Sequence, residues 1–188
     1  QGSGTGYKYT TSCAQVGSVG GVPVMLFDLN NNGLYNEIGT DAMIVGKGKS
    51  ASYLSRIVNL KGSLFLFEAS ANGADVSITP YEGDAGTLDA VNGYVSKGRL
   101  SSAVFTSKDG KVSFDLANAK NGLLVPAMEY RLTSGFAEKG GEKVKIRRGN
   151  MRAVEVKASE TRTVAWGGPL HMEFDTFRTD PEQVTVNL

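Results

Sequence analysis

The residues best suited to do chemistry stand close together in one short segment, residues 28–41. Oxygen-bearing side chains occupy its first, third and fifth positions, as Asp28, Asn30 and Asn32, and Gly33 follows at the sixth. A hard cation takes about six to eight oxygen ligands, and alternate residues of a tight loop can all point inward where a glycine permits the sharp turn. The spacing therefore predicts a calcium site in this segment.

Two further features complete the predicted ligand set. Leu34, at the seventh position, offers its main-chain carbonyl, and the carboxylate of Asp41 or Glu37 would close the shell. An EF-hand loop needs a glutamate at the twelfth position, where this chain has Gly39, so an EF-hand is excluded. Because no nucleophile stands nearby, we expect the ion to be structural and to stiffen a connection between two strands.

This segment resembles the DxDxDG-type calcium loops of dockerins, thrombospondin type 3 repeats and many secreted bacterial β-proteins. It departs from that pattern by carrying Asn at the third and fifth positions. Fewer charges imply weaker binding, which suits the millimolar calcium of an extracellular setting. The alternative interpretation is an Asn-rich loop whose side chains bond their own backbone without a metal.

Motifs for nucleotide binding and catalysis are incomplete in this chain. The run Gly46–Ser50 (GKGKS) is similar to the end of a phosphate-binding loop, but that loop needs a glycine where Met43 stands. His171 is the only histidine, and no motif gives it a catalytic partner. We therefore expect that the protein is not an enzyme.

Composition limits the partners in a similar way. Twenty Lys and Arg residues against 19 Asp and Glu give a net charge of +1, so we expect no binding to nucleic acid. No apolar run approaches the ~18 residues of a membrane span, so we expect no membrane insertion. The charge is nevertheless divided, with a net −3 over residues 1–96 and a net +4 over residues 97–188.

Short runs of apolar and β-branched residues recur at intervals of about ten residues, separated by Gly, Asn and Asp, which is typical of a β-sandwich or barrel. We expect an all-β fold of two packed antiparallel β-sandwich modules, Ig-like or prealbumin-like, at residues 1–96 and 97–188. Segment 50–58 fits a strand or a helix about equally well. The expected strands are residues 7–15, 22–27, 42–45, 53–58, 63–69, 75–79, 100–106, 111–116, 129–133, 143–147, 153–157, 161–166, 171–177 and 183–187.

A second segment, Gly122–Gly135 (GLLVPAMEYRLTSG), carries a short strand signature. It resembles the signature of prealbumin-like modules, the carboxypeptidase regulatory-like and Cna B-type domains of secreted proteins, with Glu129 where glycine is usual. The resemblance implies that residues 98–166 form such a module and that its role is structural, as in a stalk.

A basic stripe is predicted on strand 143–147. Lys143, Lys145 and Arg147 share one strand face, and we expect Val144 and Ile146 to point inward. The stripe suits an anionic glycan or the acidic face of a neighbouring molecule. The other interpretation is a solvated strand that uses Lys to resist edge pairing.

The N-terminal segment suggests how copies could associate. Residues 7–16, which include Tyr7 and Tyr9, could pair with the open sheet edge of a neighbouring subunit, and head-to-tail contacts without closure make a filament. A single Cys13 excludes an internal disulfide.

Together these features predict a calcium-stabilised structural subunit of an extracellular or cell-surface bacterial assembly, with a self-associated fibre as one form and any export signal already removed. The alternative is a calcium-dependent adhesion or carbohydrate-binding module that uses the basic stripe and exposed aromatics such as Tyr81 and Tyr94.

Overall fold

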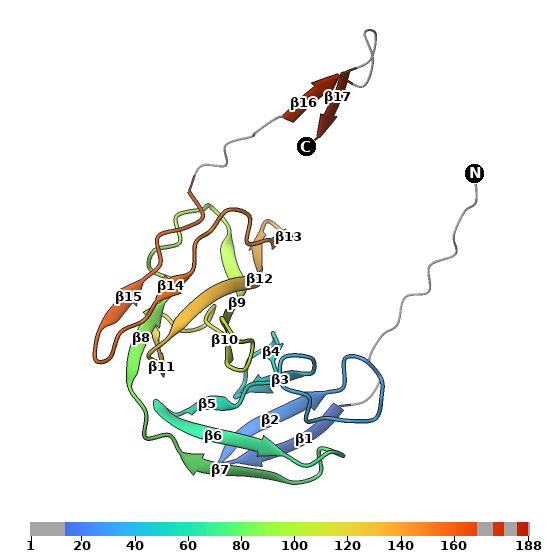
Figure 1. Cartoon of the computed structure of the whole chain (residues 1–188), viewed down its shortest axis with the longest axis vertical. Coiled ribbons are helices and arrows are strands. Elements are labelled where there is room, and N and C mark those ends of the chain that lie inside the picture. Colours follow the sequence, from blue (N-terminus) through green and yellow to red (C-terminus); the bar gives the residue numbers. More distant parts are fainter. Residues whose placement is uncertain (1–13, 169–174, 179–183, 188) are drawn as a thin grey trace, which may run out of the picture.

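The computed structural model describes residues 14–168, 175–178 and 184–187, and all regular structure in them is β (Figure 1). The predicted all-β class is confirmed. The first two sheets are antiparallel. Their strand orders are β1-β2-β3-β4 and β5-β6-β7. These strands are β1 (Ala14–Val19), β2 (Val22–Phe27), β3 (Ala42–Val45), β4 (Ser52–Tyr53), β5 (Ile57–Leu60), β6 (Ser63–Ala69) and β7 (Val76–Pro80).

The later part of the chain forms two further sheets and a hairpin. One sheet has the order β10-β9-β12-β13, with β14 also paired to β12; the other has the order β11-β8-β15, in which β15 runs parallel to β8. β16 and β17 pair with each other. The strands are β8 (Ala85–Asp89), β9 (Arg99–Ser107), β10 (Ser113–Asp115), β11 (Leu123–Pro126), β12 (Glu129–Lys139), β13 (Glu142–Ile146), β14 (Val154–Glu155), β15 (Thr161–Thr163), β16 (Asp175–Arg178) and β17 (Val184–Asn187).

Two hydrophobic cores hold these sheets together. The first core lies between the first two sheets. Every second residue of β2 is buried, and these side chains pack against one face of β5 and β6. The second core collects the inward faces of β8, β9, β11 and β12, with Phe105, Val125 and Tyr130 among its fully buried side chains. The Tyr130 hydroxyl donates to the main-chain oxygen of Pro126 at 3.0 Å, which ties the start of β12 to the end of β11.

The ribbon of β5 and β6 belongs to both cores. Ile57 and Leu64 face the second core, while Val58 and Phe67 face the first. Asn59, on the same side as Ile57, donates its amide to the main-chain oxygen of Leu124 at 2.9 Å. Because successive residues of a strand point to opposite faces, one ribbon can seal two apolar interiors.

Several predicted elements are confirmed and others are corrected. Strands 22–27, 42–45 and 63–69 have the predicted bounds as β2, β3 and β6. The predicted strand 53–58 is interrupted between β4 and β5, and the helical alternative for 50–58 is wrong, because Ser55 bonds to the main chain of Ile57 in place of a regular ladder. The predicted strands 7–15, 171–177 and 183–187 fall partly outside the described residues, and Cys13 and His171 lie wholly outside them.

Two strands were not predicted, β8 and β11. β8 contains Gly86, which weakens the strand pattern in the sequence. A glycine is needed there because the backbone of Lys157 lies so close that a Cβ atom would collide with its main-chain oxygen.

The division at residue 96 stays a prediction. β8 lies before it and pairs with β11 and β15, which lie after it. No helix in the described residues is long and apolar enough to cross a membrane.

Residues 54–56 connect the two cores, and we name them the 54–56 link. Ser55 is fully buried, and its hydroxyl donates to the main-chain oxygen of Ile57 at 2.7 Å and accepts from the N–H of Ser113 at 3.0 Å. The N–H of Arg56 donates to the oxygen of Lys111 at 2.9 Å. The link therefore fastens β10 to the first part of the chain.

We expect Ser55→Ala to lower the free energy of unfolding by about 1–3 kcal/mol, because it leaves the buried N–H of Ser113 without its acceptor. Urea unfolding would measure the change. Ser52→Ala is the matched control: that half-exposed hydroxyl makes only a 3.2 Å bond to the oxygen of Tyr53, so its cost should stay within about 0.5 kcal/mol. Equal costs for the two variants would contradict the role of the link.

Candidate metal centre

The predicted loop, residues 28–41, joins β2 to β3. These strands pair antiparallel, with Phe27 opposite Ala42, so the two ends of the loop are held side by side. Asp28 and Asp41 follow and precede that pair, and both are buried, at 6% and 1% exposed. The hairpin therefore brings together two carboxylates that are 13 residues apart in sequence.

Each buried carboxylate has one well-bonded oxygen and one weakly bonded oxygen. Asp28 accepts from the N–H of Gly33 at 2.7 Å through Oδ2, and from that of Asn32 at 3.3 Å through Oδ1. Asp41 accepts from the N–H of Glu37 at 2.9 Å through Oδ2, and from that of Leu29 at 3.3 Å through Oδ1. The strong bonds fix the loop, and the two Oδ1 atoms keep capacity for another ligand.

The remaining predicted ligands lie on the exposed side of the loop. The side-chain amides of Asn30 and Asn32 donate to Oε2 of Glu37 at 2.8 and 2.6 Å. Their carbonyl oxygens accept from the N–H groups of Asn32 and Leu34 at 3.3 and 2.8 Å. These are the self-bonded turns that the metal-free interpretation predicts, and they also gather the oxygen-bearing side chains around Glu37.

Electrostatics within the loop favour a cation. Burial raises the pKa of Asp41, bonds from the N–H groups of Glu37 and Leu29 lower it, and the negative charges of Glu37 and Asp28 raise it again. The carboxylates of Glu37 and Asp28 therefore repel that of Asp41. A bound cation would relieve that repulsion.

The donor set fits a hard cation. It consists entirely of oxygens, from carboxylates and amides, as Ca²⁺ prefers. Within the described part of the chain, no three His, Cys, Asp or Glu side chains gather as a ready-made metal site. A bound ion would therefore need the amide oxygens of Asn30 and Asn32 as well, which requires those amides to turn from Glu37.

The loop is also fastened to the 54–56 link. The N–H of Gly39 donates to the oxygen of Leu54 at 3.1 Å, and the N–H of Leu54 donates to the oxygen of Asp41 at 2.7 Å. A Cβ atom on Gly39 would lie 2.9 Å from the main-chain oxygen of Gly110, in the β9–β10 turn. The role of the 54–56 link could not be predicted from sequence patterns, because its contacts join residues far apart in the chain.

The predicted partner-binding residues lie elsewhere. Tyr7 and Tyr9 fall outside the described residues. Lys143 and Lys145 are exposed on β13, and Arg147 follows its end. The expectation that Val144 points inward is wrong, since it is 62% exposed: β13 is an end strand and β12 is its only paired neighbour in the described residues.

The aromatic residues of the alternative prediction are not freely exposed. Tyr81 and Tyr94 are partly buried and pack against the second core. The rings of Tyr94 and Trp166 lie 5.0 Å apart between centroids, and the Trp166 indole donates to the oxygen of Ala90 at 2.7 Å. These contacts give both tyrosines a packing role.

We expect calcium to raise the melting temperature. With a Kd near ~1 mM, ~10 mM CaCl₂ adds about 1.4 kcal/mol, a Tm shift of about 3–5 °C by calorimetry. The double variant Asn30→Ala/Asn32→Ala should lose the shift, because it removes two ligands. Asn72→Ala is the matched control, since it removes a similar self-bonded turn in the β6–β7 connection. If calcium leaves the Tm of the wild-type protein unchanged, the predicted metal site is ruled out.

We expect Gly39→Ala to destabilise the protein more than Gly46→Ala. Both glycines have positive φ, 77° and 80°, so alanine costs about 1–2 kcal/mol of backbone strain at either position. Only at Gly39 would the new methyl meet another main chain, which should add at least about 1 kcal/mol. Chemical unfolding of both variants gives the comparison, and equal losses would show that the loop does not press on the β9–β10 turn.

Comparison with protein-family models, with curated proteins and with solved structures gives no match for this chain. The resemblances to DxDxDG-type loops and to prealbumin-like modules accordingly stay predictions. A function for this protein is argued below from its own residues.

Proposed function

We propose that this protein is a non-enzymatic structural subunit of an extracellular bacterial assembly, in which copies join through sheet edges and calcium stiffens each subunit. The observation that carries the proposal is the character of β1. It is an end strand of its sheet, it is exposed along most of its length, and Val16 on it is 70% exposed. Its sequence, AQVGSV, contains no charge and no proline.

An edge of this kind favours strand addition. Proteins usually protect end strands with Lys, Pro or bulges, because unpaired main-chain groups can pair with any added strand. β13, also an end strand, is protected in this way by Lys143 and Lys145. β1 lacks such protection, so a strand of another copy would meet less resistance there than at β13.

The added strand is proposed to come from the N-terminal segment of a neighbouring copy. Residues 14–16 pair with β2 of their own chain, with Ala14 opposite Phe27 and Val16 opposite Met25. The proposed donor is therefore confined to residues before Ala14, which include Tyr7 and Tyr9. Addition that repeats from copy to copy without closing makes a filament.

Calcium would act on the rigidity of the subunit. The loop that carries the predicted ligands bonds to Leu54 and lies against the β9–β10 turn. A filament transmits force through each subunit, so a connection between the two cores that resists bending is useful there. The division of charge between the halves would favour head-to-tail order, although salt screens such attraction beyond about 8–10 Å.

We expect the purified protein to form polymers in millimolar calcium, and Val16→Lys to convert them to monomers, because a charge on the edge opposes strand addition. Light scattering after size-exclusion chromatography, with negative-stain imaging, would measure this. Val95→Lys is the matched control: Val95 is 68% exposed and lies outside the strands. A monomer at all concentrations, or polymers unaffected by Val16→Lys, would overturn the proposal.

A further inference from the structure

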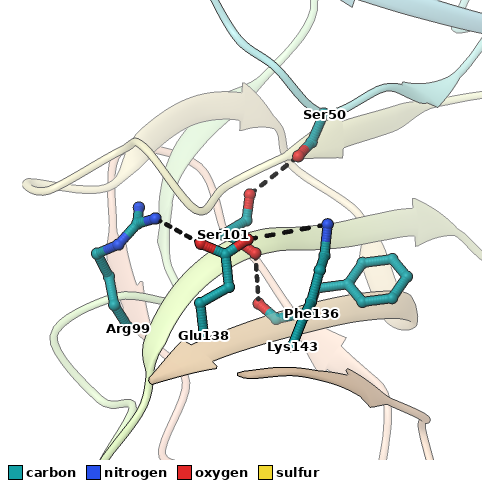
Figure 2. Close-up of polar contacts among 6 residues, drawn as sticks. All are labelled: Ser50, Arg99, Ser101, Phe136, Glu138 and Lys143. Atoms are coloured by element: carbon teal, nitrogen blue, oxygen red, sulfur yellow. Dashed lines mark hydrogen bonds and ion pairs between the residues drawn. The ribbon is translucent and has the colours of Figure 1, made fainter. Parts of the chain in front are cut away.

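A cleft of about 920 Å³ lies between the loop that joins β3 to β4 and the β9, β12 and β13 strands. Figure 2 shows how its two sides are connected. The Ser50 hydroxyl donates to the main-chain oxygen of Ser101 at 2.9 Å, and the Ser101 hydroxyl donates to that of Phe136 at 3.4 Å. These bonds hold the loop against the sheet, so the cleft has a fixed wall on each side.

The lining of the cleft carries a net positive charge. Four cationic side chains face two carboxylates there. Asp115, one of the carboxylates, is turned toward the backbone, where it accepts from the N–H groups of Ala103 and Ala117 at 2.8 and 3.0 Å. The cationic residues are Lys47, Lys49, Arg99 and Lys143.

Glu138, the other carboxylate, positions two of the cations. It pairs with Arg99 at 2.8 Å and with Lys143 at 3.8 Å, and the Lys143 ammonium also lies 4.5 Å from the centroid of the Phe136 ring (Figure 2). One carboxylate cannot neutralise two cations. Both remain accessible, because the Arg99 and Lys143 side chains are 71% and 53% exposed.

The other two cations are available to a ligand. Lys47 and Lys49 are exposed on the β3–β4 loop, and neither forms an ion pair within the described residues. The Ser50 bond places this loop opposite Arg99, so positive charge stands on both sides of the cleft. Such an arrangement attracts a ligand that carries several negative charges.

The rest of the lining indicates which anion fits. The wall of the cleft is about equally polar and apolar, and most of its apolar residues, such as Met43, Ile57 and Phe114, are themselves buried. Hydroxyl and amide groups stand among the cations and suit a ligand rich in hydroxyls. They belong to Ser50, Ser52, Asn59, Ser101 and Asn118.

We propose that this cleft binds an oligosaccharide that carries carboxylate or sulfate groups, held by Lys47 and Lys49 on one side and by Arg99 and Lys143 on the other. The volume lies within the range of about 300–1,000 Å³ typical of ligand sites. Binding at this cleft requires neither polymer formation nor the calcium loop, and a monomer would retain it.

Isothermal titration calorimetry with defined hexasaccharides would test the site. One probe is sulfated (heparin-derived), one contains uronic acid (oligogalacturonate), one is neutral (maltohexaose), and hexaglutamate represents an acidic peptide. We expect binding of one or both acidic sugars. The double variant Lys47→Gln/Lys49→Gln should weaken it about tenfold, and Lys120→Gln/Lys157→Gln, which removes the same charge outside the cleft, should change it less than about twofold.

Glu138→Gln tests the same site in the opposite direction. It removes the carboxylate that competes for Arg99 and Lys143, so affinity for the acidic sugar should rise about threefold. The proposal is overturned if no acidic sugar binds, if maltohexaose or hexaglutamate binds as tightly, or if the two double variants weaken binding equally. Melting curves would confirm that each variant is folded.

Discussion

The structure depends on one ribbon, β5 and β6, which closes two apolar interiors at once. Its alternate side chains divide between them, with Ile57 and Leu64 facing one core and Val58 and Phe67 facing the other. Neither core is complete without this ribbon, because a sheet stabilises a fold only by burying an apolar face against another layer. The two parts of the chain are therefore coupled through shared hydrophobic burial as well as through polar contacts.

The polar contacts between the two parts of the chain lie at one end of the same ribbon, next to the start of β5. The 54–56 link leaves the strand pattern just before β5. Its Ser55 hydroxyl bonds to β10, and its main chain bonds to Lys111 and to the loop between β2 and β3. Asp28 and Asp41 close that loop from within, each with one oxygen committed to the backbone. A loop arranged in this way can affect both cores, since its anchor points lie where they meet.

The contact between the β3–β4 loop and β9 also determines where the basic side chains of the cleft lie. The β3–β4 loop extends toward β9, where Ser50 fastens it, and so Lys47 and Lys49 come to lie across a cleft from Arg99. By motif, these lysines are not part of a nucleotide-binding site, because the phosphate-binding loop needs a glycine where this chain has Met43. Their proposed role arises from position in space and needs no motif.

The sequence by itself determined the all-β class, because strands of period two are a local property of apolar and β-branched residues. It also located the 28–41 loop, because the spacing of its oxygen-bearing side chains is local in the same sense. Only the tertiary structure decided which faces of β5 and β6 serve which core, that Val144 is exposed, and that β8 and β11 are strands. These depend on which strands become neighbours, and pairing between residues far apart in the chain leaves little trace in local composition.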